Sequence, residues 1–250
     1  MTTQQVTYKP TNEFELFEWQ VAPYHDTSPV LLLTGSAGGG KSRFAYEKIV
    51  MFCWAYPGAT VLALRKRRED AMRSVVAALS HNVIGTHPHV THNKSELVFR
   101  FYHGPNKPYS HLYYGGMKGA LERKAIRSIG PDGGVDMALM EEAIEFEEED
   151  FDELMGRMRG KAAPWVQLIL CTNPDKPLHW INRRLILGGG ASVYKSSALD
   201  NPTNPSHYID TLKSLKGIQR RRLYLGEWCI GEGAVMDTWE DDFNPGTGKD

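Results

Sequence analysis

Residues 35–42 read Gly35-Ser36-Ala37-Gly38-Gly39-Gly40-Lys41-Ser42, and this stretch decides the fold of the 250-residue chain. An apolar run at residues 30–34 precedes it, and a segment of helical character at residues 43–56 follows it. The pattern G-x-x-x-x-G-K-S between a strand and a helix is typical of a loop whose backbone N–H groups surround phosphates. Glycines leave the space that a Cβ would fill, and the helix dipole favours the anion. Residues 35–42 therefore predict a nucleoside triphosphate site.

The last two residues of the loop have expected chemical roles. Lys41 is predicted to reach the β- and γ-phosphates, and the Ser42 hydroxyl is placed to bind Mg²⁺.

Strands and helices alternate along most of the chain. Buried strands are predicted at residues 30–34, 59–64, 135–140 and 165–171, a short strand at residues 192–197, and helices at residues 43–56, 69–79, 149–158 and 178–187. Residues 96–102 and 111–114 alternate aromatic and polar side chains around a Gly-Pro-Asn turn, which predicts an antiparallel pair. The pattern indicates an α/β fold with a mainly parallel central sheet flanked by helices, a P-loop NTPase of the ASCE or RecA-like type. We expect an ATPase core at residues 1–200 and a short linker subdomain at residues 201–250.

Composition limits the function classes. The formal net charge is -1, so a role with nucleic acid must depend on local basic runs such as residues 65–68 and 220–222. The three cysteines follow no metal-binding pattern, and the N-terminus does not resemble a signal peptide. No apolar stretch approaches the roughly 20 residues that span a bilayer. These features predict an intracellular protein with reduced thiols and no membrane segment.

An acidic pair, Glu141 and Glu142, follows the predicted strand at residues 135–140. In the usual Walker B arrangement the first acid holds the Mg²⁺ shell and the second polarises the attacking water, which assigns metal binding to Glu141 and catalysis to Glu142. The first acid is more often Asp, so the longer Glu141 side chain is expected to act through a water. Asp136 is the rival metal ligand, but it lies at the start of the strand, roughly 15 Å from the edge where ligands bind.

Two further segments bear on the same site. Thr172 and Asn173 follow the apolar strand at residues 165–171 and can sense the γ-phosphate through hydrogen bonds. Gln20 lies in an aromatic-rich segment, residues 14–20, predicted to be a helix. A glutamine there can bind both polar atoms of the adenine edge, although a lone glutamine is more typical of a surface position.

Together these motifs resemble the ATPase domain of the large terminase subunit of tailed phages, the motor that pumps DNA into proheads. The resemblance covers nearly the whole chain, and its pieces are Trp19-Gln20, residues 35–42, 61–66, 115–128, 140–143, 156–160, 171–174, 196–202 and 225–228. It implies an ATPase that uses ATP and Mg²⁺, with Gln20 on adenine, residues 35–42 on phosphate, Ser42 and Glu141 on the metal, Glu142 in catalysis, and Thr172 and Asn173 as the coupling motif.

The family usually carries an RNase H-like nuclease after this domain. Few clustered acids remain at the end of this chain, so no DNA cleavage is expected; they are Asp237, Glu240, Asp241 and Asp242.

Many family members also place an arginine inside the phosphate loop, whereas residues 36–39 are Ser, Ala, Gly and Gly. The resemblance then implies an arginine finger from a neighbouring subunit. The arginines considered are Arg127, which is favoured, Arg123, Arg157 and Arg159, although each could equally form an ordinary salt bridge.

The implied partners are double-stranded DNA, the portal protein, the small terminase subunit and further copies of the chain. A homo-oligomeric ring, a pentamer, is expected when assembled, and a monomer in isolation. The protein would act on the prohead in the host cell cytoplasm. DNA would be gripped through its backbone, either by residues 96–114 with Arg100 and Lys107, or by residues 65–68; the sequence does not distinguish the two.

Three alternatives stay open. A helicase-like ATPase normally needs a second RecA-like domain, for which the chain has no room. A small-molecule kinase would have a lid with several arginines. A nucleotide-binding module without turnover disagrees with a carboxylate at the Glu142 position.

Overall fold

A computed structural model describes residues 14–130 and 134–231 of the chain. Its described strands form one sheet of eight, in the order β3-β4-β5-β2-β6-β7-β1-β8. Their bounds are β1 (Val30–Gly35), β2 (Thr60–Arg65), β3 (Val90–Asn93), β4 (Val98–Phe101), β5 (Ser110–Gly116), β6 (Met137–Glu141), β7 (Gln167–Cys171) and β8 (Ser192–Ser196). The α/β fold with a mainly parallel sheet is confirmed.

The pairing brings the ends of three strands together. β1 runs parallel to β7 and β8, and β6 runs parallel to β7 and β2. Glu141 is opposite Cys171 in the register, and Leu33 is also opposite Cys171. Because the strands are parallel, the carboxyl ends of β1, β6 and β7 meet at one edge, where ligands bind in such sheets.

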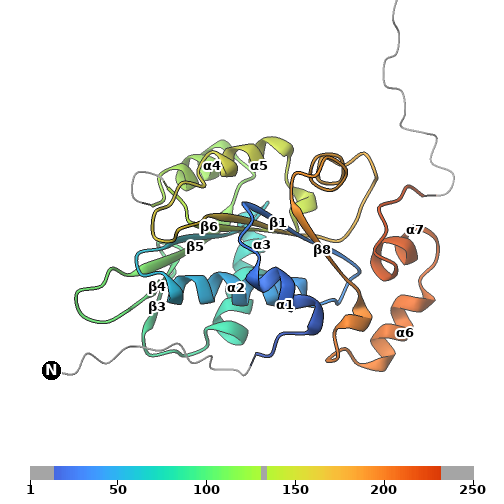
Figure 1. Ribbon diagram of the computed structural model, residues 1–250, viewed down its shortest axis with the longest axis horizontal. Helices are drawn as coiled ribbons and strands as arrows, with labels where there is room; N and C mark the ends of the chain where they lie inside the picture. The colour runs from blue at the N-terminus through green and yellow to red at the C-terminus, as the bar shows by residue number, and fades with distance from the viewer. Residues whose placement is uncertain (1–13, 131–133, 232–250) are drawn as a thin grey trace, which may run out of the picture.

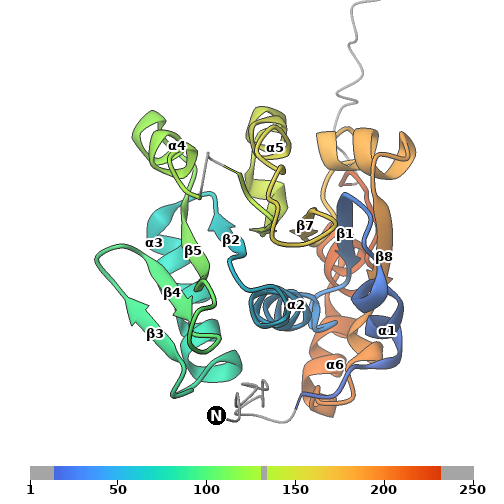
Figure 2. The ribbon, with the colours of Figure 1, turned by 60° about the vertical axis from the view of Figure 1, so that its left-hand side comes forward.

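Helices cover both faces of the sheet, as Figures 1 and 2 show, with α1 and α2 on one side and α4 and α5 on the other. Two apolar clusters, one on each face, form the core. The helical segments are α1 (Glu18–His25), α2 (Lys41–Ala55), α3 (Arg68–Asp70), η1 (Ala71–Val75), η2 (Ala78–Val83), α4 (Ala120–Arg127), η4 (Ala143–Glu145), α5 (Glu148–Met155), η5 (Ile181–Leu187), η6 (Ala198–Asp200), α6 (Ser206–Ser214), α7 (Gly217–Gln219) and η7 (Arg220–Tyr224).

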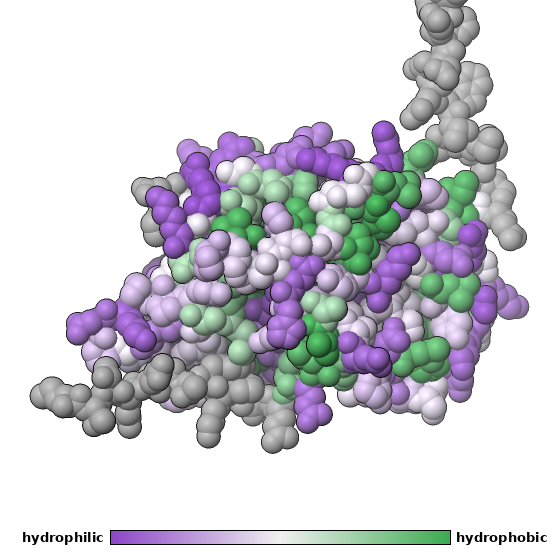
Figure 3. Space-filling model, viewed as in Figure 1, coloured by the Kyte–Doolittle hydropathy of each residue, from purple (hydrophilic) through white to green (hydrophobic). Residues whose placement is uncertain are grey.

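The outer surface over α4 and α5 is mostly hydrophilic (Figure 3). Within the described ranges, none of the helices combines the length and the apolar character that crossing a membrane requires.

The structure corrects one sequence prediction and adds two features to the sheet. The first helix is α1, which begins at Glu18 rather than at residue 14. The antiparallel pair exists as β4 and β5, but β3 extends it and was not predicted. In addition, β5 pairs in parallel with β2, so the hairpin continues the main sheet, a pairing that the sequence did not specify.

The segment after residue 200 lies directly against the phosphate loop. The side chains of Asn201 and Asn204 both donate to the Gly38 carbonyl, at 2.8 and 2.9 Å. The backbone N–H of Ala37 donates to the Leu223 carbonyl at 2.8 Å. Residues 201–223 therefore contact the loop from two sides.

Candidate nucleotide site

The phosphate loop joins the carboxyl end of β1 to the first turn of α2. Gly38 and Gly40 have φ angles of 76° and 85°, a left-handed conformation that glycine adopts without a steric cost. A Cβ on Gly40 would lie 3.3 Å from Gln20 Nε2 and from the ring of Phe17. Glycine at this position thus gives the loop its shape and lets the residues before β1 close on it.

A cavity of about 220 Å³ lies against this loop. Its lining brings together the predicted residues of three strand ends, namely residues 37–43, Glu141, Glu142 and residues 171–173. We call it the phosphate cavity.

Lys41 is buried at the floor of the loop. Its Nζ donates to Ser36 O at 2.5 Å, to Gly35 O at 3.4 Å and to Asn173 Oδ1 at 3.0 Å. Burial lowers the pKa of Lys41, while the nearby Glu142 and Glu141 raise it. The direct hydrogen-bond partners of the ammonium are therefore neutral oxygens, and a phosphate would give it a directly bound anion.

Ser42 and Glu141 form the hydrogen-bonded pair expected of a metal site. The Ser42 hydroxyl donates to Glu141 Oε1 at 2.6 Å. Glu141 Oε2 is buried and has no hydrogen-bond partner among the described residues. Hydroxyl and carboxylate oxygens are hard ligands of the kind that Mg²⁺ prefers, and one oxygen of this carboxylate has no partner, so the residues present fit this ion.

Glu142 has an unusual backbone conformation. Its φ and ψ are 52° and 57°, in the left-handed region that non-glycine residues seldom occupy. The conformation ends β6 sharply, and Glu142 lines the phosphate cavity although it is only half-buried. Such strain is frequent at functional positions.

The two residues after β7 differ in their contacts. Asn173 reaches Lys41 through the hydrogen bond described above, and both residues line the phosphate cavity. Thr172 is buried, and its hydroxyl donates to the carbonyl of Asn173 at 2.9 Å. Asn173 is thus the member of the predicted coupling motif that already contacts the loop.

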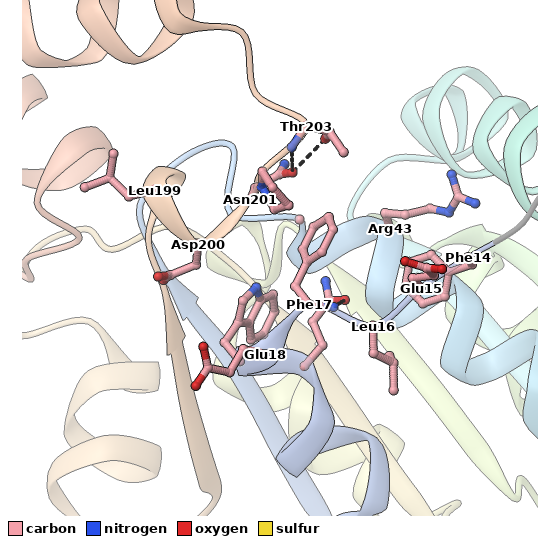
Figure 4. A pocket seen from close by; sticks show the side chains of 14 residues that line it. Phe14, Glu15, Leu16, Phe17, Glu18, Arg43, Leu199, Asp200, Asn201 and Thr203 are labelled. Carbon is pink, nitrogen blue, oxygen red and sulfur yellow. Dashed lines mark hydrogen bonds between the residues drawn. The ribbon is translucent and has the colours of Figure 1, made fainter.

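A second, larger cavity of about 1150 Å³ adjoins the phosphate cavity at Gly40 and Arg43, which line both. Figure 4 shows residues 199–203 on one side of it, residues 14–18 on the other, and Arg43 from α2. We call it the base cavity.

Gln20 lies at the wall of the base cavity and is fully buried, contrary to the surface position expected for a lone glutamine. Its Oε1 accepts from Phe17 N at 2.9 Å, whereas Nε2 has no partner among the described residues. A buried amide without an acceptor is costly, and a base with a ring nitrogen or carbonyl would supply the missing acceptor. The base cavity therefore has an unpaired amide donor at its wall.

The favoured arginines are engaged elsewhere within their own chain. Arg123 pairs with the fully buried Asp150 at 2.7 Å, and Arg127 pairs with Glu153 at 2.6 Å. Arg157 donates to Ile129 O at 2.9 Å. Arg123, Arg127, Arg157 and Arg159 do not line the phosphate cavity.

Asp136 is not a metal ligand of this site. Its carboxylate accepts the backbone N–H groups of Thr60 at 2.8 Å and Ala162 at 2.9 Å, so it joins the amino end of β2 to the loop before β7. The C-terminal acids Asp237, Glu240, Asp241 and Asp242 lie outside the described residues.

Sequence reasoning missed Arg43, although it directly follows the glycine-rich motif. Arg43 borders both cavities and pairs with Glu47 one helical turn away at 2.8 Å. Its position immediately after Ser42, in the first turn of the helix that follows the phosphate loop, is the sequence signal that could have identified it.

The burial of Glu141 predicts a pH-dependent cost to stability. Burial raises its pKa from 4.5 to about 7, helped by the charge of Glu142 and opposed by the Ser42 hydrogen bond. A raised folded-state pKa contributes stability below pH 4.5 that is lost as the pH rises through about 7. Without nucleotide, Glu141→Gln should therefore be more stable than wild type at pH 8, by up to about 3 kcal/mol, with little difference at pH 4.5.

Urea unfolding at the two pH values measures this difference. Glu149→Gln, a change at an exposed acid of α5, is the control and should show no such pH dependence. If Glu141→Gln is no more stable than wild type at pH 8, the carboxyl is not destabilised by burial.

Comparisons with known proteins show the family and the fold. A profile of the phage terminase large subunit family matches residues 29–227. No curated protein is significantly similar in sequence. Among solved structures, the large terminase of a thermophilic bacteriophage superposes with a TM-score of 0.73 at 17% identity, over 92% of this chain and 57% of its own. That terminase has also been solved with ADP and with ATP-γ-S.

The large terminase ATPase domain of Thermus phage P74-26 superposes with a TM-score of 0.60 at 16% identity, over 86% of this chain and 94% of its own. These likenesses show a shared fold, and the chain spans little more than half of the first of these terminases. Because the family profile matches well over half of its residues, the chain belongs to the phage terminase large subunit family.

Proposed function

We propose that the chain is an ATPase, the motor domain of a DNA-packaging terminase that couples ATP hydrolysis to movement of double-stranded DNA. The observation that carries the proposal is the continuity of the two cavities. The phosphate cavity unites Lys41, Ser42, Glu141 and Glu142, and Gln20, whose amide nitrogen has no partner among the described residues, lines the base cavity beside it.

Each residue then has a defined task. Gln20 Nε2 donates to the base, and the loop amides and Lys41 bind the phosphates. Glu142 accepts a proton from, or orients, the water that attacks the γ-phosphate. Asn173 exchanges its hydrogen bond with Lys41 when a phosphate arrives, which gives the loop after β7 a nucleotide-dependent position.

Ser42 and Glu141 would hold Mg²⁺. A bound Mg²⁺ neutralises charge on the phosphate oxygens. Because the described arginines Arg123 and Arg127 are outside the phosphate cavity of their own chain, the proposal includes a ring in which one of them acts on the neighbouring subunit. The portal protein and the small terminase subunit are the proposed assembly partners.

The basic run at residues 65–68 divides into two halves. Arg65 and Lys66 turn inward, toward Glu145 at 3.2 Å and the buried Asp150 at 2.5 Å. Arg67 and Arg68 are exposed and form no ion pair with any described residue.

Lys118 belongs to the same surface, because Met117 N donates to Lys66 O at 3.1 Å and Lys118 is also exposed and unpaired among the described residues. By contrast, Arg100 on the hairpin pairs with Glu96. We propose Arg67, Arg68 and Lys118 for the DNA contact, because this surface has three exposed cations without an ion pair among the described residues, whereas of Arg100 and Lys107 on the hairpin only Lys107 lacks one.

Reversing two of these charges should weaken DNA binding. Arg67→Glu with Arg68→Glu is expected to lower affinity for any duplex sequence and to reduce the slope of log affinity against log salt by about 2, because each phosphate contact contributes about 0.9. Fluorescence anisotropy over a salt series measures both. The control is Lys213→Glu with Lys216→Glu, which reverses two charges in α6 and just after it. An unchanged slope in the first variant would move the DNA contact elsewhere.

Measuring ATP hydrolysis with and without double-stranded DNA tests the proposal as a whole. Turnover that rises with DNA supports a motor. If DNA does not change the rate of ATP hydrolysis at low salt, the result would favour another P-loop hydrolase. Transfer of phosphate to a small molecule would favour a kinase.

A further inference from the structure

The helix α1, which carries Gln20, is only weakly fixed by its own sequence. It has eight residues, fewer than an isolated helix needs to persist in water, and Pro23 within it removes one backbone donor. Of the residues of α1, only Gln20 and Pro23 are buried. The position of α1 therefore depends on its contacts with neighbouring elements.

Lys48, in the middle of α2, supplies two of these contacts. Its Nζ donates to Pro23 O and to Asp26 O, both at 2.7 Å. One turn earlier on α2, Phe44 packs against Trp19, with ring centroids 5.8 Å apart. The carboxyl end of a helix has carbonyls without a partner in the helix and a partial negative charge, which an ammonium complements. Lys48 therefore fastens the last turn of α1 to α2.

Lys48 is held in this position although its surroundings disfavour the charge. The residue is 5% exposed, and it lines a cavity of about 170 Å³ together with Tyr24, Tyr56 and Trp165. Burial lowers the pKa of Lys48 to about 8, and the charge of Asp26 opposes this effect. A methionine would fill the same space without the cost of burying an ammonium, so packing alone does not account for a lysine here.

The other end of α1 borders the base cavity and the phosphate loop. Gln20 Oε1 accepts from Phe17 N at 2.9 Å, so the amide is oriented by the first turn of the helix. Its Nε2 has no partner among the described residues and would lie 3.3 Å from a Cβ on Gly40. A shift of α1 would therefore move the unpaired donor relative to the loop.

We propose that Lys48 is a positioning residue for base recognition, which clamps the carboxyl end of α1 to α2 and so keeps the Gln20 amide at the wall of the base cavity. This inference rests on the proposed role of Gln20 in binding the base. Lys48 acts through α1, and it lines neither the base cavity nor the phosphate cavity.

A merely structural role for Lys48 would behave differently. It predicts a change in melting temperature and, in the folded protein, either unchanged ligand binding or an equal loss for every ligand of the loop. A positioning role predicts a loss confined to ligands that carry a base. Tripolyphosphate provides the comparison, because it can occupy the phosphate cavity but has no base.

The test compares wild type with Lys48→Met, Gln20→Met and the double variant Lys48→Met/Gln20→Met in the 250-residue chain. Calorimetric titrations with ATP and with tripolyphosphate, each with Ca²⁺ in place of Mg²⁺, give the two Kd values. We expect Lys48→Met to bind ATP about 10-fold more weakly, because a buried hydrogen bond to the base is lost, with the Kd for tripolyphosphate changed less than about 2-fold. The double variant should bind ATP no more weakly than Gln20→Met, since both changes remove the same interaction.

Lys94→Met is the matched control, because Lys94 is exposed between β3 and β4 and lines neither cavity. It should keep both affinities. If Gln20→Met weakens ATP binding alone, then wild-type ATP affinity in Lys48→Met, or an equal loss for ATP and tripolyphosphate, would overturn the role of Lys48 and leave the proposed function intact. Wild-type ATP affinity in Gln20→Met would instead overturn the proposed base contact, and this inference with it. If Lys48→Met does not fold, the same comparison of ATP with tripolyphosphate in Lys48→Gln decides between the two roles.

Discussion

Replacing Lys41 with alanine is expected to abolish measurable ATP hydrolysis and to weaken ATP binding. The Lys41 ammonium is buried and within hydrogen-bond distance of the loop carbonyls and Asn173. Phosphate would meet this charge in a site of low polarity, where one preorganised donor typically accounts for about 100- to 1000-fold in rate. Turnover by coupled phosphate detection and affinity by calorimetry measure the two effects.

The stability of the same variant separates this loss from unfolding. Burial lowers the pKa of Lys41, so the ammonium is destabilised in the nucleotide-free chain and its removal should not lower the melting temperature. Lys176→Ala, at an exposed lysine in the loop after β7, serves as the control and should retain binding. Wild-type affinity in Lys41→Ala would mean that nucleotide binds elsewhere.

Replacing Glu142 with glutamine is expected to lower kcat by about 100- to 10,000-fold while ATP still binds, because the amide cannot take a proton from the attacking water. The change keeps the size of the side chain, and Glu142 is half-buried, so the fold should be retained. Steady-state hydrolysis and equilibrium ATP binding together measure the effect.

Glu149→Gln is the control for Glu142→Gln, since Glu149 is exposed on α5 and does not line the phosphate cavity. If Glu142→Gln and wild type turn over equally, another group activates the water. Loss of ATP binding in Glu142→Gln would instead indicate that the carboxylate shapes the site and is not specific to the reaction.

Local patterns explain why much of the site could be predicted. The phosphate loop depends on glycines at fixed spacing and on the adjoining strand and helix, all within residues 30–56. The acidic pair and Asn173 follow apolar runs, and parallel strands bring their carboxyl ends to one edge. These inferences needed no knowledge of distant contacts.

Distant contacts explain what the sequence could not show. The run at residues 65–68 is uniform in charge, yet Arg65 and Lys66 turn toward acids 80 and 84 positions away while the next two arginines face outward. The burial of Gln20 depends on its approach to Gly40. Similarly, the pairing of β5 with β2 is a long-range choice that the alternating pattern of the hairpin does not specify.

The division into a core at residues 1–200 and a linker at residues 201–250 remains a proposal. The contacts of Asn201, Asn204 and Leu223 with the phosphate loop show that the described part of the second segment touches the candidate nucleotide site. A salt bridge between Arg222 and Asp175 also ties this segment to the loop after β7. Any motion of the phosphate loop would therefore displace residues 201–223 or break these contacts.

The central claim is that these cavities bind and hydrolyse ATP. A time course of phosphate release from ATP and Mg²⁺, by wild type and by Lys41→Ala at equal concentration, tests it most directly. We predict repeated release of phosphate by wild type and none above background by Lys41→Ala. Equal release by the two proteins, or none by folded wild type in the presence of DNA, would contradict the claim.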